Sequence, residues 1–411
     1  MQYGCIGRKL GHSFSKIIHN KLEDYDYQLT ELEPQALDEF MKERDFKAIN
    51  VTIPYKQDVI SYLDYTDSIA KSIGAVNTIV NVDGKLYGYN TDFSGMRALI
   101  DRLGIEVRGK KVAILGSGGT SKTAYAVADS MGAREIYRVS RSGRDGGITY
   151  GELYEKHSDT DVIINTTPCG MYPEIYGAAV DIDRLEKLSG VVDAVYNPLR
   201  TQLVSRALEK GIAAGGGLYM LVAQAVFAAE HFTGKKYERA QIDRIFAELY
   251  AQKENIVLVG MAGCGKSTLG RELAKRLGRE LIDSDDEIVK REGAIPAIFE
   301  RVGEKGFRKI ESEVIREISA KSGIIIATGG GAVLDMDNVR ALKMNGRTVF
   351  LDRAVEDIPA TPDRPLSCDR ERLTALYEKR LPIYESVADV RIKVSNDIQK
   401  NTELIINECF G

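Results

Sequence analysis

Two glycine-rich loops of different design each follow an apolar, strand-like run in this chain of 411 residues. The first loop, Gly116-Ser117-Gly118-Gly119, follows the run Val112–Leu115. The second, Gly260-Met261-Ala262-Gly263-Cys264-Gly265-Lys266-Ser267, follows Ile256–Val259. The first kind of loop suits a dinucleotide pyrophosphate, and the second suits a nucleoside triphosphate. The chain is therefore predicted to combine a hydride-transfer unit with a phosphoryl-transfer unit.

The composition is that of a globular chain with more than one core. Its length predicts about two to four domains, and an apolar fraction of 44% is ordinary for such a protein. A net charge of −4 without any basic run argues against a nucleic-acid-binding protein. No apolar run reaches the ~20 residues that a membrane helix needs, so no membrane partner is expected. The scattered cysteines and the lack of an evident signal peptide predict a cytoplasmic protein.

The order of the expected elements predicts an α/β fold. A strand–turn–helix pattern recurs over residues 110–215 and predicts a parallel sheet with helices on both faces. Its expected strands are Lys111–Leu115, Glu135–Val139, Asp161–Asn165 and Gly190–Ala194. Residues 217–250 are predicted to be helical. A new alternating pattern begins at Asn255, and the joint at Ala251–Glu254 lacks Pro, Gly and Ser. We therefore expect a helix that runs almost directly into a strand there.

A lysine and an aspartate in the first half could bracket one ketone or hydroxyl group. In the run Asn50–Lys56, strand alternation would point Val51 and Ile53 into a core and place Lys56 just beyond the strand end. Asp92 ends another expected strand. On two neighbouring strand ends, the lysine can move a proton while a hydride moves to or from carbon. The alternative interpretation is an ordinary surface ion pair.

Several dispersed motifs, taken in order, resemble the shikimate dehydrogenase family across essentially all of residues 1–250. They are Gly11-His12-Ser13-Phe14-Ser15, Asn50–Lys56, Ile73–Thr78, Asn90-Thr91-Asp92, Asn165–Pro168, Asp193–Tyr196 and Gly217–Gln224. The resemblance implies that Lys56 and Asp92 are the catalytic pair. It implies that Ser13 and Ser15 hold a substrate carboxylate. The further ligands that it implies, for the carboxylate or the ring hydroxyls, are Thr52, Asn77, Asp92, Tyr196 and Gln224.

The first glycine loop is expected to bind NADP(H). Its third glycine is displaced from the usual GxGxxG spacing, but it lies between a strand and a helix. The next expected strand ends at Ser140-Arg141-Ser142 without an acidic residue. An acid there would hold a ribose hydroxyl, whereas an arginine accommodates a 2′-phosphate, so NADP is favoured. Asp145 keeps NAD open as an alternative. The predicted cofactor contacts are Gly116, Ser117, Gly118, Gly119, Thr120, Ser140, Arg141, Ser142 and Gly217.

The second loop is a full GxxxxGKS match and the strongest short motif in the chain. Backbone N–H groups of such a loop surround the phosphates, Lys266 reaches the β- and γ-phosphates, and Ser267 ligates Mg²⁺. The following segment carries Leu269 and Leu273 on one helical face. The predicted ATP-binding residues of the loop are Gly263, Cys264, Gly265, Lys266, Ser267 and Thr268.

Carboxylates and arginines further along predict a small anionic acceptor. Asp283 and Asp285 follow an expected strand, where alternation would put both carboxylates on one face. One could support Mg²⁺ through water while the other binds or activates an acceptor hydroxyl. Arg308 and Glu311 lie one helical turn apart, so the glutamate can orient the guanidinium. The run Gly329–Gly331 allows a substrate to approach the backbone. Several arginines at one pocket suit a carboxylate.

This set resembles the shikimate kinase family across nearly all of residues 255–411. The acceptor ligands that the resemblance implies are Asp285, Arg308, Gly330 and Arg380, with Asp285 also catalytic. It implies that Asp283 supports Mg²⁺ and that Arg364 is a lid arginine near ATP. The segment between Leu351 and Arg364 is short and acidic, and it lacks an arginine often found just upstream of Arg364-Pro365-Leu366. The adenine contacts and the motion of the lid are therefore left unassigned.

The complete expectation is an α/β protein of three domains. They are a dehydrogenase substrate-binding domain (1–95 and 216–250), a Rossmann-type NADP-binding domain (96–215) and a P-loop kinase domain with a parallel β-sheet (255–411). The resemblances imply a bifunctional enzyme that reduces 3-dehydroshikimate with NADPH and phosphorylates shikimate with ATP and Mg²⁺. The alternative is an NAD-dependent quinate or shikimate dehydrogenase whose kinase-like domain is regulatory. Small-molecule substrates are the expected partners, and the oligomeric state is open.

Overall fold

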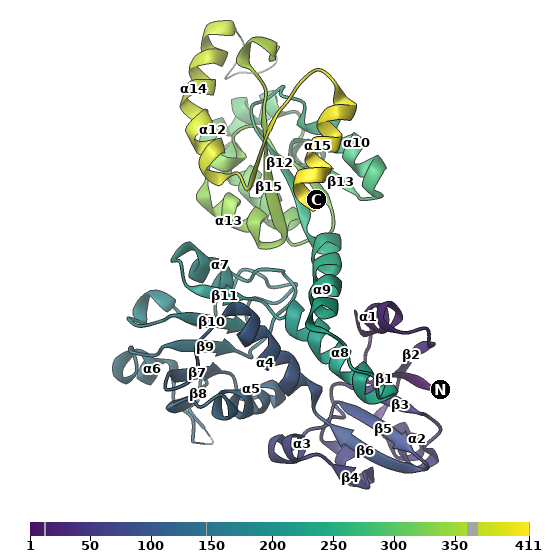
Figure 1. Cartoon of the computed structure of the whole chain (residues 1–411). Coiled ribbons are helices and arrows are strands. Elements are labelled where there is room, and N and C mark those ends of the chain that lie inside the picture. The colour runs from purple at the N-terminus through teal and green to yellow at the C-terminus, as the bar shows by residue number, and fades with distance from the viewer. Residues whose placement is uncertain (12–13, 145, 360–368, 411) are drawn as a thin grey trace. The chain divides into compact units, whose positions relative to one another are not determined.

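The computed structural model describes residues 1–11, 14–144, 146–359 and 369–410. The chain divides into two compact units: Met1–Asn197 with Thr201–Glu248, and Pro198–Arg200 with Leu249–Gly411. Figure 1 labels the elements in chain order. Among the described residues, no helix is both long enough and apolar enough to span a membrane.

The first sheet of the first unit mixes parallel and antiparallel strands in the order β2-β1-β3-β5-β6-β4. Strand β5 is antiparallel to both β3 and β6. Strands β3 and β6 therefore run the same way, and their carboxyl ends lie at one edge of the sheet. The strands are β1 (Tyr3–Gly7), β2 (Tyr27–Glu31), β3 (Ala48–Val51), β4 (Tyr65–Thr66), β5 (Thr78–Val82) and β6 (Lys85–Tyr89).

A helix from much later in the chain packs on this first sheet. Ala228 and Phe232 of α8 (Leu218–Thr233) share one buried cluster with Cys5, Tyr27 and Ala48. The region predicted to be helical over 217–250 forms α8 and α9 (Arg239–Lys253), with Gly234 ending α8. The other helical elements of this part are α1 (Phe14–Leu22), α2 (Pro34–Glu43), η1 (Asp58–Tyr62), α3 (Ser68–Ile73) and α4 (Thr91–Leu103).

The second sheet of this unit is fully parallel, in the order β11-β10-β9-β7-β8. The chain moves from β7 to β8 on one side and then returns to place β9 on the other side. The strands are β7 (Lys111–Leu115), β8 (Glu135–Val139), β9 (Val162–Asn165), β10 (Gly190–Asp193) and β11 (Ala213–Gly215). The helices are α5 (Gly119–Ser130), α6 (Tyr150–Lys156), η2 (Ile182–Arg184) and α7 (Gln202–Glu209). The strand–helix alternation predicted for residues 110–215 is thus present, with strand ends shifted by at most one residue.

The second unit contains a parallel sheet in the order β13-β14-β12-β15-β16. Its central strand is apolar throughout Ile256–Val259 and fully enclosed, as expected for a strand covered on both faces. The strands are β12 (Asn255–Val259), β13 (Leu281–Asp283), β14 (Ile325–Ala327), β15 (Gly346–Asp352) and β16 (Val390–Lys393). The helices are α10 (Lys266–Leu277), α11 (Ser284–Glu292), α12 (Ile295–Ser319), η3 (Ala332–Leu334), α13 (Met336–Asn345), η4 (Val355–Asp357), α14 (Arg370–Val387) and α15 (Ile398–Phe410).

Two predictions about chain connectivity agree with this structure. Helix α9 ends at Lys253 and β12 begins at Asn255, so the predicted direct passage from helix to strand is confirmed. Helix α10 starts immediately after the second glycine loop and buries Leu269 and Leu273. The exact domain boundaries stay predictions.

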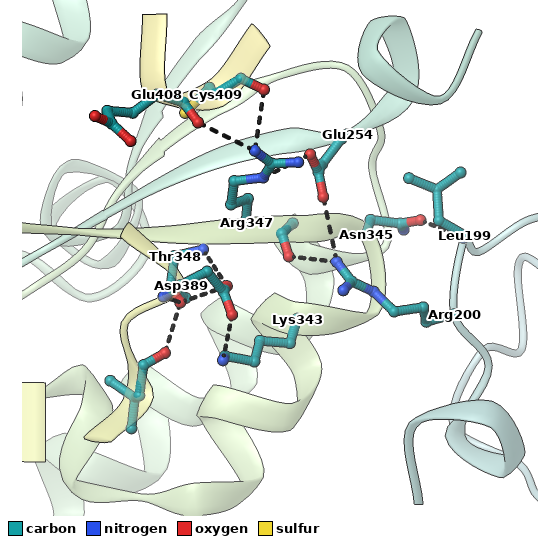
Figure 2. Close-up of polar contacts among 12 residues, drawn as sticks. Leu199, Arg200, Glu254, Lys343, Asn345, Arg347, Thr348, Asp389, Glu408 and Cys409 are labelled. Atoms are coloured by element: carbon teal, nitrogen blue, oxygen red, sulfur yellow. Dashed lines mark hydrogen bonds and ion pairs between the residues drawn. The ribbon is translucent and has the colours of Figure 1, made fainter. Parts of the chain in front are cut away.

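Polar contacts of Asp389 with the buried Thr348 fix the start of β16 to β15 (Figure 2). The Asp389 carboxylate accepts hydrogen bonds from the Thr348 backbone N–H (2.8 Å) and hydroxyl (2.7 Å). It also accepts one from Lys343 Nζ at 2.8 Å. Burial favours a higher pKa for Asp389, but the bonds from Lys343 and Thr348 outweigh it and lower the pKa. The charged carboxylate therefore stabilises this strand pair.

We expect Asp389→Asn to lower the local unfolding free energy of β15 and β16 by only about 0.5–1 kcal/mol at pH 7, because the Asp389 side chain is 36% exposed and solvent screens its charge. Because the folded-state pKa of Asp389 is depressed, the stabilisation exists above the unfolded pKa and is lost as pH falls below about 4. The difference should thus shrink on acidification. Hydrogen exchange of the β15 and β16 amides in the full chain measures it. Asp337→Asn, in an exposed ion pair with Arg340, is the control; equal effects of both changes would contradict the account.

Candidate active sites

The structure brings Lys56 and Asp92 together in the first unit. Lys56 lies in the turn after β3, and Asp92 lies in the first turn of α4, directly after β6. Lys56 Nζ is 2.5 Å from Asp92 Oδ2, and both side chains are partly exposed. The positive end of the helix dipole favours a carboxylate at this position. The prediction of neighbouring strand ends is wrong, because β5 lies between β3 and β6.

The predicted strand alternation before Lys56 also fails. Strand β3 ends at Val51, and Ile53 is 76% exposed instead of pointing into a core. The chain turns at Ile53-Pro54, and Tyr55 is the residue that anchors this turn. Its ring is buried and its hydroxyl donates to the Leu32 carbonyl. A buried tyrosine in the turn, and not strand alternation, thus delivers Lys56 to the site.

A buried amide network holds the start of α4. Asn77 is 3% exposed, and its Oδ1 accepts the Thr91 backbone N–H at 2.7 Å. Asn50 donates to the Asn77 carbonyl at 3.2 Å and accepts the Tyr27 hydroxyl at 2.7 Å. Asn77 therefore positions Thr91, the residue directly before Asp92. This structural role is separate from its predicted role as a substrate ligand. Sequence reasoning missed the role of Tyr27, whose partner Asn50 lies far along the chain.

The other predicted substrate ligands lie on several elements of the first unit. Gln224 on α8 faces Gly95 of α4, one turn after Asp92, where an added Cβ would lie 2.9 Å from Gln224 Cβ. The ring of Tyr196, in the loop after β10, meets that of Phe14 edge-on at 5.9 Å. Thr52 directly follows β3, Ser15 lies in the first turn of α1, and Ser13 lies outside the described residues. Their binding roles stay predictions.

The first glycine loop lies where the order of the second sheet reverses. Gly116 follows β7, and its N–H donates to the Val139 carbonyl of β8 at 2.8 Å. On the other side, the Thr166 hydroxyl after β9 donates to the Leu115 carbonyl at 2.6 Å. Crevices at such reversal points bind nucleotides in open α/β sheets. Helix α5 starts at Gly119, so the backbone N–H groups of its first turn are available to a pyrophosphate.

The end of β8 supplies the other predicted cofactor residues. Ser140 Oγ accepts the Gly143 backbone N–H at 3.1 Å, so this hydroxyl already shapes the turn. Arg141 is exposed directly after it, as a 2′-phosphate ligand would need to be. Ser142 is also exposed, in the same turn. Asp145, the residue that left NAD as an alternative cofactor, lies outside the described residues.

Gly217 is explained by packing. It precedes α8, and a Cβ there would lie 2.2 Å from the Ala194 carbonyl oxygen. Its N–H donates to the Val195 carbonyl at 2.8 Å. A glycine is therefore needed for α8 to approach the loop that carries Tyr196. Packing alone therefore accounts for a glycine at position 217, without the predicted contact with the cofactor.

In the second unit, the second glycine loop links β12 to α10 as predicted. Lys266 is 8% exposed, and its ammonium donates to the carbonyls of Gly260 (2.9 Å) and Met261 (2.8 Å). Ser267 Oγ donates to Asp283 Oδ2 at 2.6 Å. The predicted nucleotide and metal residues thus meet at one edge of the sheet. Across the residues that the structure describes, no cluster of three or more His, Cys, Asp or Glu side chains forms a ready metal site.

Asp283 and Asp285 come together for a different reason from the predicted strand alternation. Asp283 ends β13 and caps α11, its Oδ1 accepting the Asp285 N–H at 3.0 Å. Asp285 therefore lies in the first turn of the helix and not in the strand. Burial raises the pKa of Asp285, and the nearby Asp283 charge adds to the rise.

Arginines face Asp285 across a glycine turn. Arg308 donates to Glu311 at 2.6 Å, and Glu311 is 1% exposed. Burial raises the pKa of Glu311, while the Arg308 charge opposes the rise. A Cβ on Gly329 would lie 2.6 Å from Asp285 Oδ1, and one on Gly331 would lie within 2.3 Å of the Arg308 guanidinium. The glycines thus leave room for both charged groups.

Helix α14 closes this cluster from the other side. Arg380 is 5% exposed and donates to the Gly330 carbonyl at 3.2 Å. The buried Tyr384 donates to the same carbonyl at 2.5 Å. Sequence reasoning missed Tyr384, although its i+4 spacing from Arg380 places both on one helical face. Arg364 lies outside the described residues.

Comparisons with known proteins match each unit to a family model. A family model for the shikimate dehydrogenase substrate binding domain matches residues 5–79, and one for shikimate kinase matches residues 262–410. A shikimate dehydrogenase (NADP(+)) of Clostridium perfringens is 38% identical over 265 residues, which cover 60% of this chain and 97% of that protein. The corresponding enzyme of Bacillus cereus is 34% identical, covering 57% and 92%. The chain belongs to the shikimate dehydrogenase family.

Solved structures support the fold of the first unit. The chorismate mutase/shikimate 5-dehydrogenase fusion protein of Clostridium acetobutylicum matches with a TM-score of 0.57 and 35% identity, covering 60% of this chain and 96% of that one. Shikimate 5-dehydrogenase of Thermus thermophilus, in complex with NADP(H) and shikimate, matches with a TM-score of 0.54 and 25% identity, covering 60% and 99%. This shikimate dehydrogenase family member thus continues into a shikimate kinase domain with a P-loop fold.

The close approach at Gly217 makes a prediction. We expect Gly217→Ala to lower the unfolding free energy by about 1–3 kcal/mol, because its Cβ overpacks against the Ala194 carbonyl. Calorimetry of the full chain measures the shift of the unfolding temperature. Gly151→Ala on α6 is the control, because its nearest neighbour would be Thr149 Oγ1 at 3.8 Å. An unchanged unfolding temperature for Gly217→Ala would refute this reading.

Proposed function

We propose that the chain is a bifunctional shikimate pathway enzyme. Its first unit reduces 3-dehydroshikimate to shikimate with NADPH, and its second unit phosphorylates shikimate with ATP and Mg²⁺ to give shikimate 3-phosphate. The observation that carries the proposal is the presence of two intact constellations. The first is the Lys56–Asp92 pair. The second is the cluster of Asp285, Arg308 and Arg380 around one glycine turn.

The residues at the first glycine loop fit NADP(H). The turn from β7 to α5 offers backbone N–H groups at a reversal point, and Arg141 can pair with a 2′-phosphate. The predicted contacts from Gly116 to Thr120 and from Ser140 to Ser142 lie on these two turns. The cofactor supplies the hydride.

Residues of the first unit carry out the proton transfer at the substrate oxygen. As the carbonyl carbon of the ketone gains the hydride, its oxygen gains negative charge and takes a proton from the Lys56 ammonium. Asp92 holds that ammonium in place through the 2.5 Å contact. Ser15, Thr52, Tyr196 and Gln224, with Ser13, are proposed to hold the carboxylate and hydroxyls so that one face of the ring is presented.

The ammonium, backbone N–H, hydroxyl and carboxylate groups of the second unit suit ATP and Mg²⁺. Lys266 and the backbone from Gly263 to Thr268 would surround the phosphates, and Cys264 fits as a small buried residue. The Ser267 hydroxyl and the Asp283 carboxylate, 2.6 Å apart, are the oxygen ligands that Mg²⁺ prefers, either directly or through water. ATP supplies the phosphoryl group, and the metal neutralises its charge.

The second unit positions the acceptor and balances charge. Asp285, whose pKa burial raises, accepts the proton of the attacking hydroxyl. Arg308 and Arg380 pair with the shikimate carboxylate, and Glu311 fixes the Arg308 fork. Gly330 lets the ring approach the backbone. We also propose that Arg364 contributes near the transferred phosphate, that the enzyme acts in the cytoplasm, and that its partners are these small molecules.

Two single substitutions should separate the activities. Lys56→Ala is expected to lower the reductase kcat at least about 100-fold, because it removes the acid group. Lys266→Ala should lower the kinase kcat at least about 100-fold, because it removes a cation from the phosphates. Each variant should keep the other activity, as measured by NADPH oxidation and by formation of phosphorylated product.

Exposed lysines provide the controls for this pair of variants. Lys71→Ala on α3 and Lys275→Ala on α10 remove exposed ammonium groups from the same two units and should leave both activities unchanged. Loss of both activities in either folded site variant would contradict two independent sites. Oxidation of quinate with NAD as the preferred pair of reactants, or ATP binding without phosphorylation, would instead favour a catabolic dehydrogenase with a regulatory kinase-like domain.

The Tyr384 hydroxyl should contribute to acceptor binding. Tyr384→Phe removes the 2.5 Å hydrogen bond to the Gly330 carbonyl, so we expect the kinase KM for shikimate to rise about three- to tenfold. Tyr377→Phe is the matched control, because this residue lies on the same helix but donates to Asp352. A rise in KM of the same size in both variants would show that loss of the hydrogen bond to the Gly330 carbonyl is not the cause.

A further inference from the structure

A buried carboxylate that the proposed mechanism does not use lies at the carboxyl end of β10. Asp193 is the last residue of β10, and it pairs in register with Asn165, the last residue of β9. Both side chains are fully buried. A buried aspartate is rare unless its oxygens find partners, because desolvation penalises the charged form. The partners of Asp193 therefore indicate its role.

Three neutral donors hold the Asp193 carboxylate. Its Oδ1 accepts the Val195 backbone N–H at 3.0 Å and the Asn165 side-chain amide at 2.9 Å. Its Oδ2 accepts the Thr201 hydroxyl at 2.6 Å. Burial raises the pKa of Asp193 to about 6, and the three hydrogen bonds oppose the rise. The carboxylate is therefore mostly ionised at pH 7, where it can only accept hydrogen bonds.

A carboxylate that can only accept fixes the orientation of the Asn165 side-chain amide. Because the NH₂ group of Asn165 must face Asp193, its carbonyl oxygen is left for other donors. That oxygen accepts the Thr167 backbone N–H at 3.1 Å and the Thr167 hydroxyl at 2.7 Å. Asp193 on β10 thus fixes the conformation of the turn that follows β9.

This turn after β9 packs directly against the first glycine loop. The Thr166 hydroxyl donates to the carbonyl of Leu115, the residue before Gly116. A Cβ on Gly116 would lie 2.9 Å from Thr166 Oγ1 and 3.1 Å from Thr167 Cγ2. A shift of Thr166 and Thr167 should therefore disturb the loop that is proposed to bind the cofactor.

The same carboxylate holds the chain beside a predicted substrate ligand. Its bond to the Val195 N–H fixes the residue directly before Tyr196. Its bond to the Thr201 hydroxyl reaches the N-cap of α7, where Thr201 Oγ1 accepts the Val204 N–H at 3.3 Å. Tyr196 itself is 38% exposed, so its side chain is accessible to a substrate.

We propose that Asp193 is a positioning residue for the dehydrogenase, which fixes both the turn against the cofactor loop and the residue before Tyr196. The inference rests on the proposed function for its kinetic consequence, because NADPH and 3-dehydroshikimate are there the reactants. Asp193 acts on the cofactor side through Asn165 and on the substrate side through Val195. Its oxygens face three protein donors in the interior, so it acts through other residues and not by contact with a reactant.

The test compares Asp193→Ala, Asp193→Asn and the control Asp161→Ala in the full chain. Asp193→Ala leaves three donors without their acceptor. We therefore expect the KM for NADPH and the KM for 3-dehydroshikimate each to rise about three- to tenfold. The reductase kcat should stay within about twofold of that of the unaltered chain, because Lys56 and Asp92 lie at the other sheet of this unit.

Asp193→Asn tests the chemistry and carries the experiment if the alanine variant does not fold. It keeps an acceptor oxygen for Asn165 and Val195 but loses the negative charge, so intermediate KM values are expected. In the control, Asp161 accepts the Lys111 N–H at 2.9 Å at the amino end of the same sheet. Ligands of such sheets bind at the carboxyl end, so Asp161→Ala should leave both KM values unchanged.

Unchanged KM values in both Asp193 variants, or a rise in only one of the two KM values, would overturn the joint role. Equal rises in Asp161→Ala would also overturn it, because they would reflect a loss of stability alone. Hydrogen exchange of residues 165–167 and 194–196 should quicken about tenfold in Asp193→Ala, and unchanged exchange would contradict the positioning. An unaltered chain without reductase activity would contradict the proposed function, while exchange would still test the positioning.

Discussion

The carboxyl ends of parallel strands determine where charged groups collect in both units. Strands β3 and β6 point the same way, so the turn with Lys56 and the helix start with Asp92 lie at one edge of the first sheet. The same rule brings the turn after β7 to the end of β9, and the P-loop to Asp283. Helices that start at these edges direct backbone N–H groups and a partial positive charge toward them. Phosphates, carboxylates and catalytic aspartates all gain from that environment.

Local patterns predicted the features that depend on a few consecutive residues. The glycine loops, the apolar strands and the passage from α9 into β12 are of this kind, because backbone geometry and burial are encoded within a short window. The interpretation failed where a strand ended early. Ile53 was expected inside, yet β3 stops at Val51 and a buried Tyr55 holds the turn. Asp285 was assigned to a strand, yet the Asp283 side chain caps a helix there.

Contacts between distant segments could not be predicted from the sequence. The Tyr27–Asn50 bond and the Tyr384–Gly330 bond each join elements whose proximity only the fold creates. Each gives a buried polar group a hydrogen-bond partner, and a buried polar group without a partner is costly.

The central claim is that two pockets in one chain act in turn on the same small ring acid. Its most direct test is a single reaction of the full chain with 3-dehydroshikimate, NADPH deuterated at the transferred position, and Mg·ATP, followed by mass spectrometry of the product. The account predicts shikimate 3-phosphate that carries both the deuterium and the phosphoryl group. A product that lacks either label, from folded protein, would contradict it.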